Sequence, residues 1–163
     1  MTTTTARGRD RHAGSLLRSD ARSLRLLLAR LDQDQADLER ARQLLQQARE
    51  LADLAPREAF ELAHRSALRG AGVLVARANR ERRRALPLNV WTALGRLGGE
   101  DAEHAERLAP LVAERARLDR DQSALPDPVL LAQHLEGTAA HLDRVAERLL
   151  EDLPVPLTEP SAD

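Results

Sequence analysis

The side chains of this sequence that are best suited to chemistry are its histidines. His134 and His141 are seven residues apart on one predicted helix, so they lie about 10 Å apart along its axis and cannot share one metal ion. His104 follows Glu100 and Asp101, which places an imidazole and carboxylates on one helical face. A metal centre in a helical bundle needs several carboxylates from facing helices, and the sequence has no second motif of this kind. We therefore expect no metal site and interpret these histidines as solvated polar residues.

Other catalytic signatures are missing from the sequence. It contains no cysteine, which excludes a disulfide scaffold, a thiolate metal site and a cysteine nucleophile. No serine or threonine occupies a glycine-framed nucleophile turn, and Gly70-Ala71-Gly72 lacks the strand and the lysine of a phosphate loop. We expect no cofactor.

All 25 basic residues are arginine, and their distribution is uneven although the formal net charge is only −1. Residues 1–30 are rich in arginine, whereas in residues 142–163 six acidic residues stand against two arginines. A basic N-terminal arm can attract nucleic acid or an acidic surface. A second cluster follows a predicted helix and is a candidate binding patch, formed by Arg80, Arg82, Arg83 and Arg84.

The composition predicts an all-α fold. The hydrophobic residues are mostly leucine, alanine and valine, with one phenylalanine, one tryptophan and no tyrosine, which suits packed helices better than strands. We expect a bundle of about five helices. Residues 15–152 should form this bundle, between a disordered basic arm at 1–14 and a loose proline-rich tail at 153–163.

Leucine recurs at every seventh position in the first predicted helix, at Leu17, Leu24, Leu31, Leu38 and Leu45. The second apolar seam that a regular coiled coil needs is interrupted around residues 32–35. We expect either one bent helix or two helices that meet there. The leucine line could pack within its own bundle or join two copies.

Proline, glycine and capping residues predict the remaining boundaries. Pro56 and Asp127-Pro128 favour helix starts, Asn89 favours an N-cap, and Gly98-Gly99 should end a short helix. We expect a kink or break near Pro110, because proline inside a helix removes a hydrogen bond. Small residues from Ala63 to Gly72 should let a neighbouring helix approach closely.

No apolar run reaches the roughly 20 residues that a membrane span needs. The first residues lack the apolar segment of a signal peptide. We expect a cytoplasmic protein with no membrane association.

Residues 56–97, PREAFELAHRSALRGAGVLVARANRERRRALPLNVWTALGRL, resemble a small family of actinobacterial HEPN-domain proteins. In that family a helix of the form AH-x-x-ALR-x-A precedes an arginine-rich turn and a helix that begins with NVW. The matching residues are Ala63, His64, Ala67, Leu68, Arg69 and Ala71, then Arg82, Arg83 and Arg84, then Asn89, Val90 and Trp91. The likeness extends weakly to Leu149.

The resemblance implies an up-and-down bundle that is frequently dimeric and that does RNA or nucleotide work. HEPN domains include metal-independent ribonucleases and non-catalytic partners of nucleotidyltransferases. The ribonucleases carry an arginine, four to six residues, and then a histidine that serve one phosphate. The nearest match here is Arg96 with His104, which has seven residues between and no polar asparagine after the arginine.

These observations lead to three hypotheses. The first is a non-catalytic HEPN-like binding or partner module, dimeric, whose ligand is RNA, a nucleotide or another protein. The second is a toxin-like endoribonuclease that uses Arg96 and His104. The third is a structural protein that oligomerises through its leucine-repeat helix.

Overall fold

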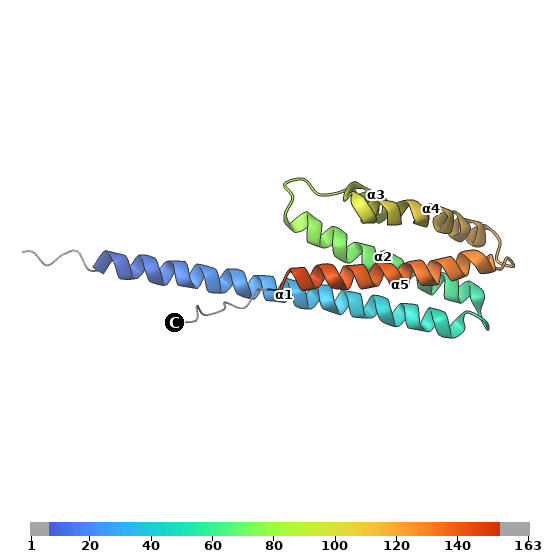
Figure 1. The fold of residues 1–163 in the computed structure, drawn as a ribbon, viewed down its shortest axis with the longest axis horizontal. Coiled ribbons are helices and arrows are strands. Elements are labelled where there is room, and N and C mark those ends of the chain that lie inside the picture. The colour runs from blue at the N-terminus through green and yellow to red at the C-terminus, as the bar shows by residue number, and fades with distance from the viewer. Residues whose placement is uncertain (1–6, 154–163) are drawn as a thin grey trace, which may run out of the picture. The chain divides into compact units, whose positions relative to one another are not determined.

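The described part of the chain forms five helices. A computed structural model describes residues 7–153, and their side chains from residue 18 onward. The helices are α1 (Arg7–Leu51), α2 (Pro56–Arg80), α3 (Val90–Arg96), α4 (Gly99–Arg120) and α5 (Pro128–Glu151), and the described residues contain no strand (Figure 1). The predicted all-α fold is confirmed.

The chain divides into two compact units, Met1–Gln33 and Asp34–Asp163, and helix α1 runs through the boundary. In the first unit, residues 18–30 are exposed, including Leu24, Leu26, Leu27 and Leu28. The second unit holds the helical bundle. Among the described helices, none is long and apolar enough to cross a membrane.

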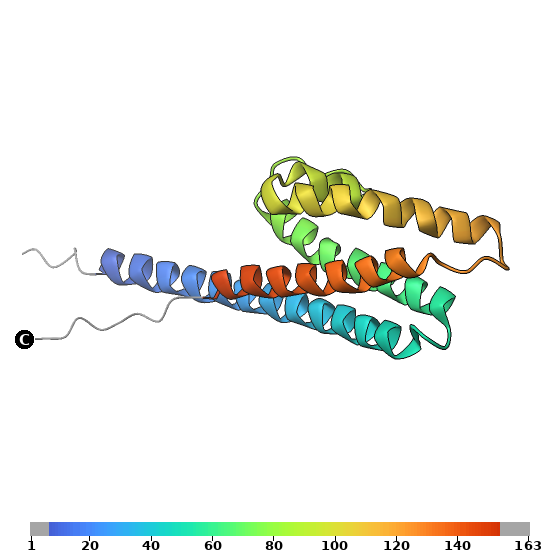
Figure 2. The ribbon, with the colours of Figure 1, turned by 45° about the vertical axis from the view of Figure 1, so that its right-hand side comes forward.

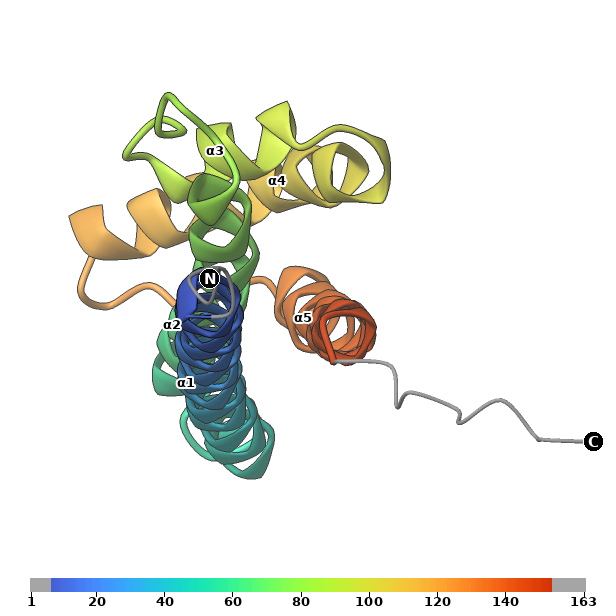
Figure 3. The ribbon, with the colours of Figure 1, turned by 90° about the vertical axis from the view of Figure 1, so that its left-hand side faces the viewer.

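Helix α2 is the central element of the bundle. It lies between residues 34–51 of α1 on one side and α3 with the start of α4 on the other (Figures 1 and 3). Successive long helices alternate in direction, and α5 runs antiparallel to residues 34–51 of α1 (Figure 2). The up-and-down topology implied by the resemblance to HEPN domains is therefore present.

Aliphatic side chains fill the core in two clusters. The first joins α1, α2 and α5 through Leu38, Leu45, Ala71, Leu74, Leu142, Val145 and Leu149. The second joins α2, α4 and α5 through Phe60, Leu108, Leu111 and Leu131. Gly70 shows why α2 needs small residues, because a Cβ there would lie 2.5 Å from Cδ2 of Leu142. The predicted close approach is real, although it is made by a side chain of α5.

Helix α1 continues through the interruption of its leucine repeat. Asp34, which breaks the second seam, is 2% exposed and receives two hydrogen bonds from the guanidinium of Arg80, at 2.7 and 2.6 Å. Leu38 and Leu45 are buried, whereas Leu24 is 46% exposed. A polar residue on this face therefore pairs with α2, and no break in the helix is needed.

Local capping chemistry sets most helix ends. Pro56 and Pro128 lie in the first turns of α2 and α5, and the side chains of Asn89 and Asp127 accept hydrogen bonds from the first backbone N–H groups of α3 and α5. Gly98 has a φ of 74°, which suits glycine in the turn between α3 and α4. The expected break near Pro110 is absent, because α4 is continuous through that residue.

The expected limits of the bundle differ from the helix bounds at the N-terminus. Helix α1 begins at Arg7, whereas we expected disorder up to residue 14. Residues 1–6 of the expected arm, and residues 154–163 of the expected tail, lie outside the described residues.

The buried pair of Asp34 and Arg80 predicts a local stability difference along α1. Asp34→Ala should lower the free energy of unfolding by about 2 kcal/mol, because it leaves a half-buried guanidinium without its carboxylate. Asp32→Ala, an exposed position one half-turn away, should change it by less than about 0.5 kcal/mol. Urea unfolding followed by circular dichroism compares the two variants, and equal effects would contradict the structural role of the pair.

Candidate functional site

The loop between α2 and α3 displays three adjacent arginines. Asn79 accepts a hydrogen bond from the backbone N–H of Leu86 at 2.8 Å, and Leu86 is buried. These contacts anchor both ends of the loop, so Arg82, Arg83 and Arg84 stand exposed between them. The guanidinium groups of these three residues make no hydrogen bond or ion pair with a residue that the structure describes, and the backbone N–H of Arg82 donates to the carbonyl of Asn79. Arg80 does not belong to this patch, because it is bound to Asp34.

The two candidate nuclease residues differ in exposure. Arg96 lies in the last turn of α3 and is exposed. His104 lies in α4, is only 2% exposed, and stacks on His141 of α5 with ring centroids 4.0 Å apart and planes 11° apart. The surrounding carboxylates are partly engaged as well, since Asp101 accepts a hydrogen bond from Arg148 at 2.8 Å.

His64, His104, His134 and His141 form a buried cluster at the contact of α2, α4 and α5. His134 packs edge-on against His64 at 5.6 Å and against Phe60 at 5.1 Å between ring centroids. The interpretation of the histidines as solvated residues was therefore wrong for His104, His134 and His141. A signal existed in the sequence, because residues 134, 138, 141 and 145 have the 4-3-4 spacing of one helical face.

Burial keeps these imidazoles neutral. It lowers the pKa of His104 to about 4, with further contributions from Arg144 and Arg107. It lowers the pKa of His134 to about 4 and that of His141 to about 3, where His104 and Arg144 add to the effect of burial. The pKa of His64 is lowered for the same main reason. At pH 7 the cluster therefore offers uncharged rings to a ligand.

Part of the cluster opens into a pocket of about 410 Å³ between α4 and α5. His104, Leu108 and Leu111 from α4 and His134 and Thr138 from α5 are buried lining residues. The remaining lining residues are Arg107, Pro110, Gln133, Glu136 and Gly137. Within the described part of the chain, no three histidine, aspartate, glutamate or cysteine side chains are placed to hold a metal ion.

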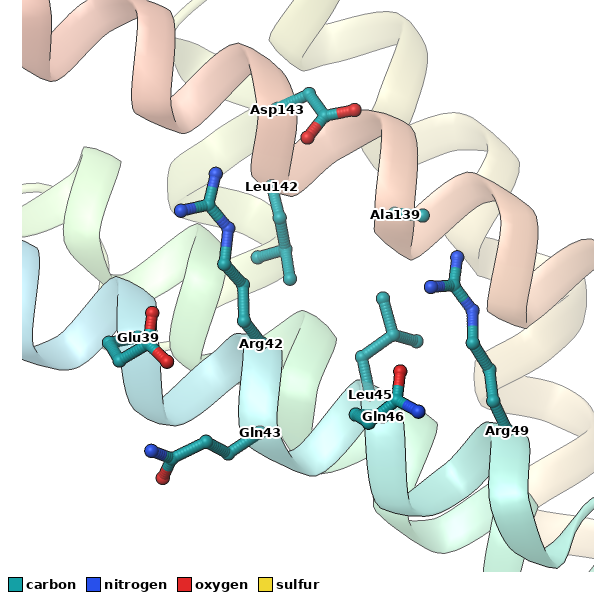
Figure 4. A pocket seen from close by; sticks show the side chains of 9 residues that line it. All are labelled: Glu39, Arg42, Gln43, Leu45, Gln46, Arg49, Ala139, Leu142 and Asp143. Atoms are coloured by element: carbon teal, nitrogen blue, oxygen red, sulfur yellow. The ribbon is translucent and has the colours of Figure 1, made fainter.

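A second concavity, of about 450 Å³, lies between α1 and α5 (Figure 4). Arg42 and Arg49 of α1 extend toward α5, and Leu45 and Leu142 lie between the two arginines. Asp143 of α5 and Glu39 of α1 also line it, so its charges are mixed. Charged and amide side chains make up more of the lining of this groove than of the α4–α5 pocket, and sequence reasoning missed both.

The helical bundle, with its central α2 and its arginine-rich loop before α3, is that of the HEPN-domain proteins. The family model of the SAV_6107-like HEPN proteins matches residues 48–146, more than half of the chain, and the chain belongs to this family. The match spans α2 to most of α5 and so confirms the resemblance inferred from residues 56–97. No curated protein and no solved structure matches the chain.

The buried histidines predict an acid-sensitive fold. The unfolded chain binds protons near pH 6.5, whereas the folded rings of His104, His134 and His141 bind them only near pH 3 to 4. The contribution of these neutral rings to the free energy of unfolding is therefore fully present above pH 6.5. It is lost as the pH falls, by about 1.4 kcal/mol per pH unit for each histidine. Urea unfolding at pH 7, 6 and 5 measures this slope, before most carboxylates are protonated.

A variant assigns the slope to the cluster. His141→Gln should reduce the slope of the unfolding free energy against pH by the contribution of one histidine, about 1.4 kcal/mol per pH unit, even if the variant is less stable at pH 7. A wild-type free energy of unfolding that is constant from pH 7 to pH 5 would show that the rings take up protons in the folded state.

Proposed function

We propose that this chain is a non-catalytic HEPN module that binds the phosphates of RNA or of a nucleotide through Arg82, Arg83 and Arg84, and that it acts as a dimer. The observation that carries the proposal is that the charged and the titratable side chains of the bundle lie in different places. The free cations of this region are exposed on a loop, whereas the histidines are buried and neutral.

The alternative of a metal-independent endoribonuclease is disfavoured by the state of His104. A general base or acid must come within hydrogen-bond reach of the proton it moves. His104 stacks on His141 and is 2% exposed, while Arg96 is exposed at the end of α3. A pKa near 4 also makes His104 a weak base, and at neutral pH it leaves the ring without the proton that a general acid donates.

Phosphate binding is supported by the arginine loop. Three adjacent guanidiniums without a described carboxylate partner create a local positive potential, and arginine forms paired hydrogen bonds with phosphate oxygens. The chain has one phenylalanine and one tryptophan, and Phe60 is buried while Trp91 packs on His64. Base stacking therefore has few platforms, and we expect binding to the backbone with little sequence preference.

The loop predicts a specific effect of arginine removal. The triple variant Arg82→Gln, Arg83→Gln, Arg84→Gln should bind single-stranded RNA more weakly. The slope of log K against log salt should also fall by about 2 in magnitude, because three phosphate contacts are lost. Fluorescence anisotropy with a labelled oligonucleotide at several salt concentrations measures both quantities.

A matched triple variant at Arg40, Arg65 and Arg120, exposed arginines of α1, α2 and α4 outside the loop, removes the same charge. It should leave the affinity within about threefold of wild type, because these positions lie outside the proposed site. Equal losses in both triple variants would mean that net charge, and not the loop, governs binding.

The purified protein should not cleave a mixed RNA substrate, with or without divalent metal, because His104 is buried and stacked on His141. Gel electrophoresis of an end-labelled RNA tests this. Cleavage that disappears in both Arg96→Ala and His104→Gln, while Trp91 fluorescence shows that folding persists, would establish the nuclease in place of the binding module.

Self-association is supported by the exposed leucines of α1. Replacing Leu24, Leu27 and Leu28 together with glutamine should convert a dimer into a monomer, because these side chains are exposed in one copy and can bury apolar surface against another. Sedimentation velocity measures the mass. Leu54→Gln, at another exposed leucine, should leave it unchanged, and a dimer that survives the triple substitution would place the interface elsewhere.

A further inference from the structure

The α4–α5 pocket has the features of a small-molecule site that the arginine loop does not use. Its wall is apolar at Leu108, Pro110 and Leu111, and its inner surface carries the buried side chains of His104 and His134. A concave, mostly apolar site with a few convergent polar groups is the usual form of a ligand pocket.

Two imidazole nitrogens at this pocket lack a hydrogen-bond partner among the described residues. Nδ1 of His134 lies 3.2 Å from the hydroxyl oxygen of Thr138, which leaves Nε2 of His134 without one. Nε2 of His104 is also buried and unpaired. Buried polar atoms are rarely left unsatisfied, so a ligand in the pocket could supply the hydrogen-bond partner that these two atoms, on residues at most 2% exposed, lack.

The charges of the lining residues limit what that partner can be. Arg107 lies one turn after His104 on α4, is exposed, and has no hydrogen-bond or ion-pair partner among the described residues. Glu136 lines the same pocket from α5. Arg107 is the one arginine among the lining residues, so an anionic group has a single place to bind, and Glu136 repels further negative charge, as in a polyphosphate.

We propose that the α4–α5 pocket binds a small, largely apolar organic monoanion, such as an aromatic carboxylate, with its charge on Arg107 and its polar atoms on Nε2 of His104 and His134. The volume of about 410 Å³ accommodates one such molecule. The site is independent of the proposed phosphate-binding loop, because no residue is shared.

Gly137 offers a way to fill the pocket without disturbing the fold. It lines the pocket, and a Cβ at this position meets no atom within 4 Å. Gly72 of α2 is the matched control, since it is also a half-buried helical glycine with open space at Cβ but lies away from the pocket. Leucine in place of either glycine should raise helix propensity, so both variants are expected to fold.

The experiment uses 1-naphthoate as the probe, with neutral 1-naphthalenemethanol and dianionic naphthalene-1,4-dicarboxylate as comparators. Isothermal titration of the full chain should show saturable one-to-one binding that is tightest for naphthoate. Gly137→Leu should weaken it at least tenfold, and Gly72→Leu should leave it within twofold. Arg107→Gln should remove the preference for naphthoate over the alcohol, whereas Arg120→Gln should preserve it.

Nuclear magnetic resonance of ¹⁵N-labelled histidine gives a direct readout, because naphthoate should shift the Nε2 signals of His104 and His134. No saturable binding at millimolar naphthoate, unmoved Nε2 signals, equal effects of the two glycine variants, or tighter binding of the dianion would each overturn the proposal. The arginine-loop triple variant should bind naphthoate normally, which separates this result from the test of RNA binding.

Discussion

The packing of uncharged imidazole rings between α2, α4 and α5 is the interaction on which the bundle most depends. His141 and His104 join α5 to α4 by stacking, and His134 joins α5 to His64 of α2. With one phenylalanine and one tryptophan in the chain, histidine supplies most of the flat rings in the core. The arrangement holds only while the rings are neutral, because a buried imidazolium without a carboxylate partner is costly.

Arginine has mainly a structural role in this bundle. Bidentate pairs connect helices that are distant in sequence, as in Arg77 with Asp152 and Arg115 with Glu61. Arg57 donates hydrogen bonds to backbone carbonyls at and beyond the end of α4, those of Leu118, Asp121 and Ala124. Planar guanidinium groups suit these paired contacts better than an ammonium group would. The arginines without such partners are therefore the ones whose guanidinium groups are available to bind a ligand.

Much of the fold could be predicted from the sequence because the signals were local. Asn89, Asp127 and the prolines act on their own first helical turns, and the aliphatic composition favours helices. The chemistry of the core was not predictable in the same way. Whether His134 is solvated or buried depends on which helix packs on that face, and whether Arg80 is free depends on Asp34, 46 residues earlier. The α4–α5 pocket likewise exists only after two helices pack together.

Trp91 gives the bundle an internal optical reporter. It is the single tryptophan of the chain, and its ring lies 5.7 Å from His64, which in turn contacts His134. A neutral imidazole quenches indole emission weakly, whereas an imidazolium quenches it strongly. The emission of one native side chain therefore monitors the protonation of His64, without any label and without altering the core.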